Sequence, residues 1–212
     1  MLSWALEHNL ESGERLVWCL IELIRGLGGF RSTSPNFVGA EAIRNAAGAF
    51  RVEGFELSED GELRPLLLDQ LSSTEMTEAL WAYVRRAQRG AEDAALVVGT
   101  GKDLLEATAR HVLVQFYGAY AESANFPTTL GQAFAAAGLA TPADPMREGE
   151  PAQRQVERIL YQLGCVVNTL RNREGTGHGK PFLPTVSEEE AKLATECMGI
   201  VSAKLLMALK AG

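Results

Sequence analysis

Cysteine is scarce in this chain, and its placement excludes a common class of metal site. The three cysteines are Cys19, Cys165 and Cys197, and no two of them form a Cys-x-x-Cys pair. This spacing matches no zinc site and favours reduced thiols in the core of a cytoplasmic protein. We therefore expect no metal centre, and no segment of the sequence indicates a cofactor.

Long hydrophobic runs are also absent. The N-terminal segment is interrupted by Glu7, His8, Glu11 and Glu14, which breaks the pattern of a secretory signal. No other stretch approaches the roughly 20 apolar residues that a membrane-spanning helix requires. The sequence therefore predicts a cytoplasmic protein that has no membrane partner.

Positive charge is in deficit, because 27 acidic residues face 20 lysines and arginines and leave a net charge of −7. A protein with this balance does not bind nucleic acid through a general electrostatic field. Contact with a polyanion would have to use a local basic patch. The candidates for such a patch are Arg154, Arg158, Arg171, Arg173 and Lys180.

Aromatic residues make up only 7% of the chain, whereas alanine and leucine are abundant. This composition favours helices over sheets. Apolar periodicity, capping boxes and turn residues predict helices over about 2–28, 37–48, 73–89, 91–117, 128–138, 151–175 and 188–210. A β-hairpin is predicted where 55–57 and 62–64 flank the turn at Asp60-Gly61.

These elements predict a mainly α protein. Residues 1–85 form an N-terminal helical portion with a small β-hairpin, and its role is unassigned. Residues 86–212 form a four-helix arrangement. The loop over 140–150 is expected to be exposed, because it is rich in proline and charged residues.

The most distinctive segment covers residues 170–180 and reads Leu-Arg-Asn-Arg-Glu-Gly-Thr-Gly-His-Gly-Lys. It follows a helix whose apolar stripe consists of Val156, Ile159, Leu160, Leu163, Val167 and Leu170. By helical geometry, Arg171 and Arg173 flank that stripe. Gly177 and Gly179 remove side chains on both sides of His178, which leaves room for a ligand beside the imidazole.

This set of groups suits RNA cleavage. A histidine, whose ordinary pKa is about 6.5, can act as the general base or the general acid near neutral pH. A guanidinium can bind the phosphate and stabilise the charge of the transition state. The structural interpretation is that Arg171 and Arg173 offset the helix dipole and that His178 is merely an exposed loop residue.

Two other segments carry weaker signals. Residues 98–103 resemble a phosphate loop only superficially, because a Walker A motif needs glycine where Leu96 stands and serine or threonine where Asp103 stands. A helix with small packing residues is the better interpretation there. His111, inside a predicted helix, is expected to be structural or exposed to solvent.

The string over 170–180 resembles the signature of the abortive-infection C-terminal family. This family belongs to the HEPN superfamily, which comprises all-helical prokaryotic defence and toxin domains. The resemblance covers about residues 88–211 and includes the strings over 102–107 and 130–134.

The resemblance implies an HEPN-like four-helix bundle and a metal-independent endoribonuclease that acts in bacterial antiphage defence or as a toxin. It also implies a homodimer, in which two Arg-x4–6-His motifs form one composite site that binds RNA. Arg171 and Arg173 both lie at a fitting distance from His178. Arg171 is favoured because the family motif opens with an Arg-Asn pair, which here is Arg171-Asn172.

In this scheme Arg171, Asn172 and His178 are catalytic: Arg171 stabilises the phosphate, Asn172 orients groups and His178 transfers the proton. Substrate binding falls to Arg173, Gly177, Gly179 and Lys180. Lys180 occupies the position where toxins controlled by nucleotidyl modification have a tyrosine, so control of that kind is not expected. The alternatives are a non-catalytic dimeric module that binds RNA or protein, and a structural domain controlled by an antitoxin or other regulatory partner.

Overall fold

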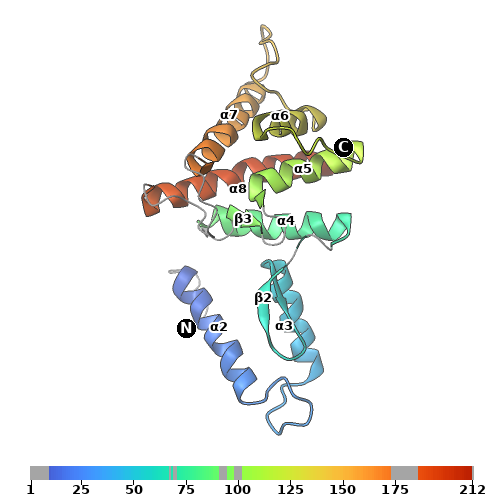
Figure 1. The fold of residues 1–212 in the computed structure, drawn as a ribbon, viewed down its shortest axis with the longest axis vertical. Coiled ribbons are helices and arrows are strands. Elements are labelled where there is room, and N and C mark those ends of the chain that lie inside the picture. Colours follow the sequence, from blue (N-terminus) through green and yellow to red (C-terminus); the bar gives the residue numbers. More distant parts are fainter. Residues whose placement is uncertain are drawn as a thin grey trace. The chain divides into compact units, whose positions relative to one another are not determined.

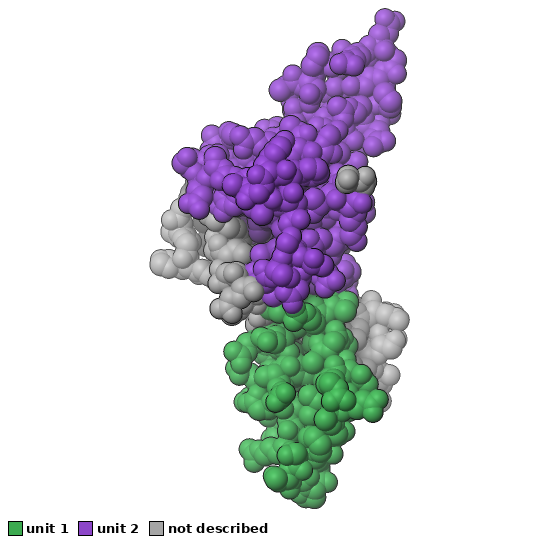
Figure 2. Space-filling view, turned by 90° about the vertical axis from the view of Figure 1, so that its right-hand side faces the viewer, with its two compact units in different colours: residues 1–67 green, residues 68–212 purple. Residues whose placement is uncertain are grey.

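The computed structural model describes residues 10–66, 68, 71–90, 95–97, 102–172 and 186–211. Contacts divide the chain into two compact units, residues 1–67 and residues 68–212 (Figure 2). The fold is mainly helical and includes a small antiparallel hairpin, which confirms the predicted fold class. Among the described helices, none is long and apolar enough to cross a membrane.

The described part of the first unit contains two helices and the predicted hairpin. Its elements are α2 (Leu10–Gly26), α3 (Ala40–Val52), β1 (Phe55–Leu57) and β2 (Leu63–Pro65). The strands pair with Leu57 opposite Leu63, and Gly61 turns the chain with a φ of 83° that favours glycine. Apolar side chains from the hairpin, α2 and α3 form the core of this unit, including Ile21, Phe55, Leu57, Leu63, Trp18 and Phe50.

The start of α3 differs from the prediction. The helix begins at Ala40 after Gly39, instead of at residue 37. Asn36, just before the predicted start, belongs to the preceding loop, where its Nδ2 donates a hydrogen bond to the Leu27 carbonyl oxygen at 3.0 Å. Cys19 also differs from the prediction, since it is exposed and does not lie in the core.

The second unit contains five described helices. They are α4 (Ser73–Gln88), α5 (Leu104–Tyr117), α6 (Phe126–Ala136), α7 (Ala152–Asn172) and α8 (Glu188–Ala211). The long helix α8 runs between α4 on one side and α7 on the other, and α5 contacts α4, α6 and α8 (Figure 1).

Local sequence signals set the ends of several of these helices. The predicted capping boxes are present at Ser72–Glu75 and at Ser187–Glu190, where side chain and backbone exchange hydrogen bonds. Gly118 ends α5 in the left-handed conformation, with a φ of 76°. These boundaries follow from short-range chemistry and were accessible from the sequence.

The predicted helix over 91–117 is wrong in its first part. Two short antiparallel strands, β3 (Leu96–Val97) and β4 (Lys102–Asp103), precede α5, which begins only at Leu104. Residues 91–94 and 98–101 lie outside the described part of the chain. Asp103 accepts a hydrogen bond from the Glu106 backbone N–H and so fixes the helix start at this position.

The core of the second unit is built where α7 crosses its neighbours. Gly164 lies at this crossing, because a Cβ atom there would stand 2.9 Å from Leu130 and 3.1 Å from Leu105. The surrounding cluster of buried side chains includes Leu105, Val112, Leu130, Phe134, Val201 and Leu205. A small residue at this point therefore allows α7 to approach α5 and α6 closely.

The division of function after residue 85 stays a prediction. The structural division falls earlier, so α4 belongs to the second unit by its contacts. At one of these contacts a Cβ on Gly199 of α8 would meet the Ala87 side chain of α4 at 3.1 Å. The α4 helix is thus part of the scaffold that supports the motif-bearing helix.

Candidate functional site

The helix α7 carries the first residues of the predicted motif at its C-terminal end. Its last two described residues are Arg171 and Asn172, and the predicted end near residue 175 lies outside the described part of the chain. The remaining predicted site residues lie outside the described part of the chain: Arg173, Gly177, His178, Gly179 and Lys180. The assigned roles of all seven residues therefore stay predictions, and the structure locates the turn of α7 from which the motif begins.

One turn before Arg171, a pair of buried polar side chains joins α7 to α5. Asn168 donates a hydrogen bond from its Nδ2 to the Oδ2 atom of Asp103 at 3.1 Å. The other carboxylate oxygen of Asp103 accepts from the Glu106 backbone N–H at 2.6 Å. Both side chains are buried, and Asp103 is 0% exposed. The end of α7 is thus tied to the N-terminus of α5.

Sequence analysis missed both of these residues. The string Asp103-Leu104-Leu105-Glu106 carries a capping signal, an aspartate three residues before a glutamate at the start of an apolar run. That signal would have located the start of α5 correctly. No short-range signal identifies Asn168 as the partner of Asp103, because the two residues are 65 positions apart.

Part of the predicted basic patch is neutralised. Arg158 forms two hydrogen bonds with the Glu150 carboxylate, at 2.6 and 2.9 Å, and is itself buried. Arg154 pairs with Glu157 at 3.0 Å and also donates to the Gly138 carbonyl oxygen at 2.8 Å. These two arginines fasten the loop over 138–150 to α7, and residues 142–149 of that loop are exposed, as expected. Arg158 is buried and adds little cationic surface, whereas the paired Arg154 side chain is 35% exposed.

Glu157 completes this attachment from the buried side of α7. Its carboxylate accepts hydrogen bonds from the Ala140 backbone N–H at 2.9 Å and from Gln153 at 3.3 Å, and Lys204 of α8 lies 3.4 Å away. Burial acts to raise the pKa of Glu157, but these hydrogen bonds and cations outweigh it and hold the pKa below its usual value. The carboxylate is therefore charged at neutral pH.

The apolar stripe of α7 is only partly covered. Of the predicted stripe, Val167 is buried, whereas Val156 and Ile159 are 53% and 61% exposed. Val166, which lies outside the predicted stripe, is 65% exposed. The buried side of the helix includes the polar residues Glu157 and Asn168, so it is rotated away from the centre of the predicted stripe. An exposed apolar row therefore runs along α7 toward the turn that carries Arg171.

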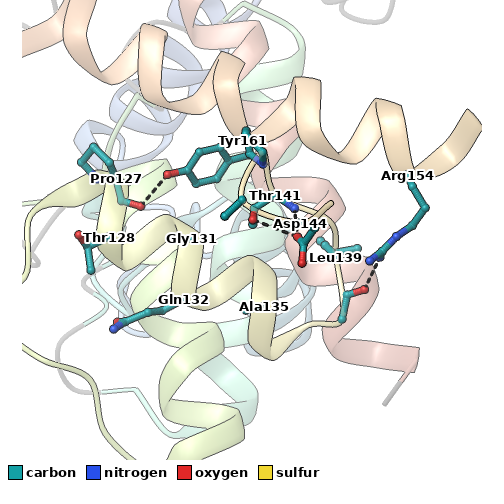
Figure 3. Close-up of a pocket in the computed structure, with 13 residues that line it drawn as sticks. Pro127, Thr128, Gly131, Gln132, Ala135, Leu139, Thr141, Asp144, Arg154 and Tyr161 are labelled. Carbon is teal, nitrogen blue, oxygen red and sulfur yellow. Dashed lines mark hydrogen bonds between the residues drawn. The ribbon is translucent and has the colours of Figure 1, made fainter. Parts of the chain in front are cut away.

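A cavity of about 630 Å³ opens between α6, α7 and the loop that follows α6 (Figure 3). The Tyr161 hydroxyl donates to the Pro127 carbonyl oxygen at 3.1 Å at one edge. Asp144 accepts from the Thr141 backbone N–H at 2.6 Å. The described residues that line the cavity include no histidine, and their charged groups are engaged within the chain. This cavity therefore does not supply the proton-transfer group expected of the site.

His111 is the histidine within the described residues, and it is structural. Its Nε2 lies 2.8 Å from the Thr77 hydroxyl, and the side chain is buried between α4 and α5. Burial lowers the pKa of His111 and so favours the neutral ring. The predicted structural role is confirmed over the solvent-exposed alternative.

Comparison with known proteins identifies one family. The family model described as Abi_C, an HEPN-like domain, matches residues 77–208. The match begins inside α4, ends inside α8 and includes the whole of α7 and the segment over 170–180. No curated protein and no solved structure matches the chain.

Proposed function

The chain belongs to the family of HEPN-like Abi_C domains, and from this membership we propose that it is an endoribonuclease whose site begins at the last turn of α7. The observation that carries the proposal is that the family match spans α7 together with the Arg-Asn pair and His178. The enzyme would act in bacterial antiphage defence or as a toxin, in the cytoplasm and without a metal ion.

The proposed reaction is cleavage of RNA by its own 2′-hydroxyl. The 2′-oxygen attacks phosphorus, its proton passes to a base, and the bond to the 5′-oxygen breaks as that oxygen takes up a proton. His178 would transfer one of these protons, since its ordinary pKa lies near neutrality. Arg171 would stabilise the phosphate charge, Asn172 would orient the reacting groups, and Arg173 and Lys180 would guide the RNA backbone.

We further propose that two copies of the chain form the site. The exposed row at Val156, Ile159 and Val166 supports a second copy as its cover, because large apolar side chains at helical spacing are costly to leave in water. The row runs toward the end of α7 that carries the motif, so pairing through α7 would bring two motifs near one another. In this proposal the two copies form a homodimer with a composite site.

The first test compares wild type with His178→Ala on mixed cellular RNA in excess EDTA. We expect cleavage by the wild type and a loss of at least about 10²-fold in rate for the variant, the usual contribution of general acid–base catalysis. Arg171→Ala and Arg173→Ala, measured in parallel, identify the arginine that acts in the reaction. Cleavage by His178→Ala at the wild-type rate would show that the assignment is wrong.

The second test concerns the dimer. Ile159→Asp places a charge in the exposed row and is expected to give a monomer that no longer cleaves RNA. Met146→Asp is the matched control, because Met146 is an exposed apolar residue of the loop before α7. Light scattering after gel filtration gives the mass of each variant. A wild-type monomer that cleaves RNA would contradict the composite site.

The competing function is a non-catalytic module that binds RNA or a protein partner, such as an antitoxin. The pairing of Arg154 and Arg158 with carboxylates favours a protein partner within this alternative, because it reduces the cationic surface available to RNA. Absence of cleavage by wild type and His178→Ala, combined with equal RNA affinity, would favour this function.

A further inference from the structure

Asp103 places a carboxyl group in a fully buried position. Its side chain is 0% exposed, and its carboxylate oxygens accept hydrogen bonds from the Glu106 backbone N–H and from Asn168. Removing a carboxylate from water is unfavourable unless good hydrogen bonds offset the lost hydration. The burial of Asp103 therefore calls for an explanation beyond local helix stability.

Helix capping alone does not provide that explanation. Ser72, Asn125 and Ser187 cap α4, α6 and α8, and all three side chains belong to exposed residues. These three caps show that an exposed side chain is sufficient to cap a helix in this protein. What distinguishes Asp103 from these three is the bond that its second oxygen accepts from Asn168 of α7.

Asn168 stands at the place in α7 where this bond affects the motif. Arg171 follows it by three residues and Asn172 by four, and residues at these spacings share one side of a helix. The bond from Asn168 to Asp103 therefore fixes the rotation of the last turn of α7 relative to the start of α5.

We propose that Asn168 and Asp103 are positioning residues of the active site. This inference rests on the proposed ribonuclease function and extends it. The pair holds the last turn of α7 in the rotation from which Arg171 reaches the scissile phosphate. Neither residue contacts RNA; each acts through the helix that carries Arg171.

Two variants break the bond from opposite ends. Asn168→Ala removes the donor and leaves the cap of α5 intact. Asp103→Ser keeps a hydroxyl that can cap α5 and removes the oxygen that accepts from Asn168. The matched control is Asn125→Ala, which deletes the exposed cap of α6, where the Asn125 side chain accepts from the Thr128 N–H. The control therefore reports the effect of a lost cap that has no bond to α7.

The first measurement is hydrogen exchange of the backbone amides over residues 167–172 in the full chain. We expect both variants to lose about tenfold in protection there and the control to keep it. The second measurement is RNA cleavage below the melting temperature of every variant. We expect kcat to fall by about 10²-fold in both variants with little change in KM, since a small misplacement of a catalytic group has this effect.

Hydrogen exchange and RNA cleavage together distinguish a failure of the positioning role from a failure of the ribonuclease proposal. Unchanged protection in both variants overturns the positioning role, whether or not the chain cleaves RNA. Lost protection together with wild-type kcat overturns it as well. Lost protection with no cleavage by the wild type itself refutes the ribonuclease proposal, and the assignment of the pair to such a site falls with it.

Discussion

His111 shows what burial does to a single ionisable residue in this fold. The imidazole is held between two helices, with the Thr77 hydroxyl 2.8 Å from its Nε2. Its surroundings lower the pKa through loss of solvation, so the folded state binds a proton less readily than the unfolded chain. The sequence indicated a helical histidine, and only the packing of α4 against α5 decides that it is buried.

The stability of the protein is therefore expected to depend on His111 in mildly acidic solution. In the unfolded chain the pKa of this histidine is near 6.5, above its value in the folded state. The contribution of His111 to the free energy of unfolding is thus fully present above about pH 6.5. It is lost as the pH drops from 6.5 through the folded pKa, because the unfolded state takes up the proton first. His111→Gln should lose less stability between pH 7 and pH 5 than the wild type.

Urea unfolding at a series of pH values measures this difference. The carboxylates titrate in both proteins, so the wild type serves as the reference for His111→Gln at each pH. Parallel pH profiles for the two proteins would contradict the burial of a neutral imidazole at this position.

At the scale of elements, local chemistry was predictable and contacts between distant segments were not. The hairpin and the capping boxes at Ser72 and Ser187 depend on residues within a few positions of one another, and they occur where the sequence placed them. The stretch before Leu104 read as helix, because small residues at helical spacing do not reveal strand pairing. The neutralisation of Arg158 by Glu150 likewise depends on how a loop folds back onto α7.

The predicted site divides in the same way. The sequence located the segment over 170–180, which the family match includes. It did not reveal the buried bond between Asn168 and Asp103, because the two residues are 65 positions apart and no local signal pairs them. It also suggested that Val156 and Ile159 would be covered, whereas α7 turns Gly164 and Val167 toward its neighbours.

Two glycines inside helices should respond in opposite ways to the same substitution. At Gly164 a new Cβ would lie 2.9 Å from Leu130 and 3.1 Å from Leu105, and both leucines are fully buried in a close-packed core. Overpacking there costs about 1–3 kcal/mol and outweighs the gain in helix propensity, so Gly164→Ala should destabilise the protein. At Gly48 of α3 no atom lies within 4 Å, and Gly48→Ala should stabilise by about 0.5–1 kcal/mol.

Urea unfolding of the two alanine variants checks the prediction against the wild type. Each variant is the control for the other, since both replace a helical glycine by the residue with the highest helix propensity. A stabilising effect at Gly164 would mean that α7 has room to move away from α5 and α6.

At the scale of the whole molecule, each described hydrophobic cluster lies within one unit. The described clusters of the second unit contain side chains from residues 95–208 only. The cluster of the first unit contains side chains from residues 18–63 only. The family match likewise lies entirely within the second unit.

A fragment that comprises residues 68–212 is therefore expected to fold without the first unit. Circular dichroism should show a helical spectrum and a cooperative thermal transition, because the described clusters of this unit lie within the fragment. The full chain provides the reference transition. A fragment that lacks cooperative melting would show that the first unit contributes to the stability of the second.

The attachment of α7 at three points has a mechanical consequence. Arg158 anchors the beginning of the helix to Glu150, Gly164 seats its middle, and Asn168 anchors its end. Contacts at three places along its length prevent α7 from rotating about its own axis. The contacts at Gly164 and Asn168 therefore hold the last turn of α7 in place even when the loop at Glu150 moves, about 20 Å away from Arg171.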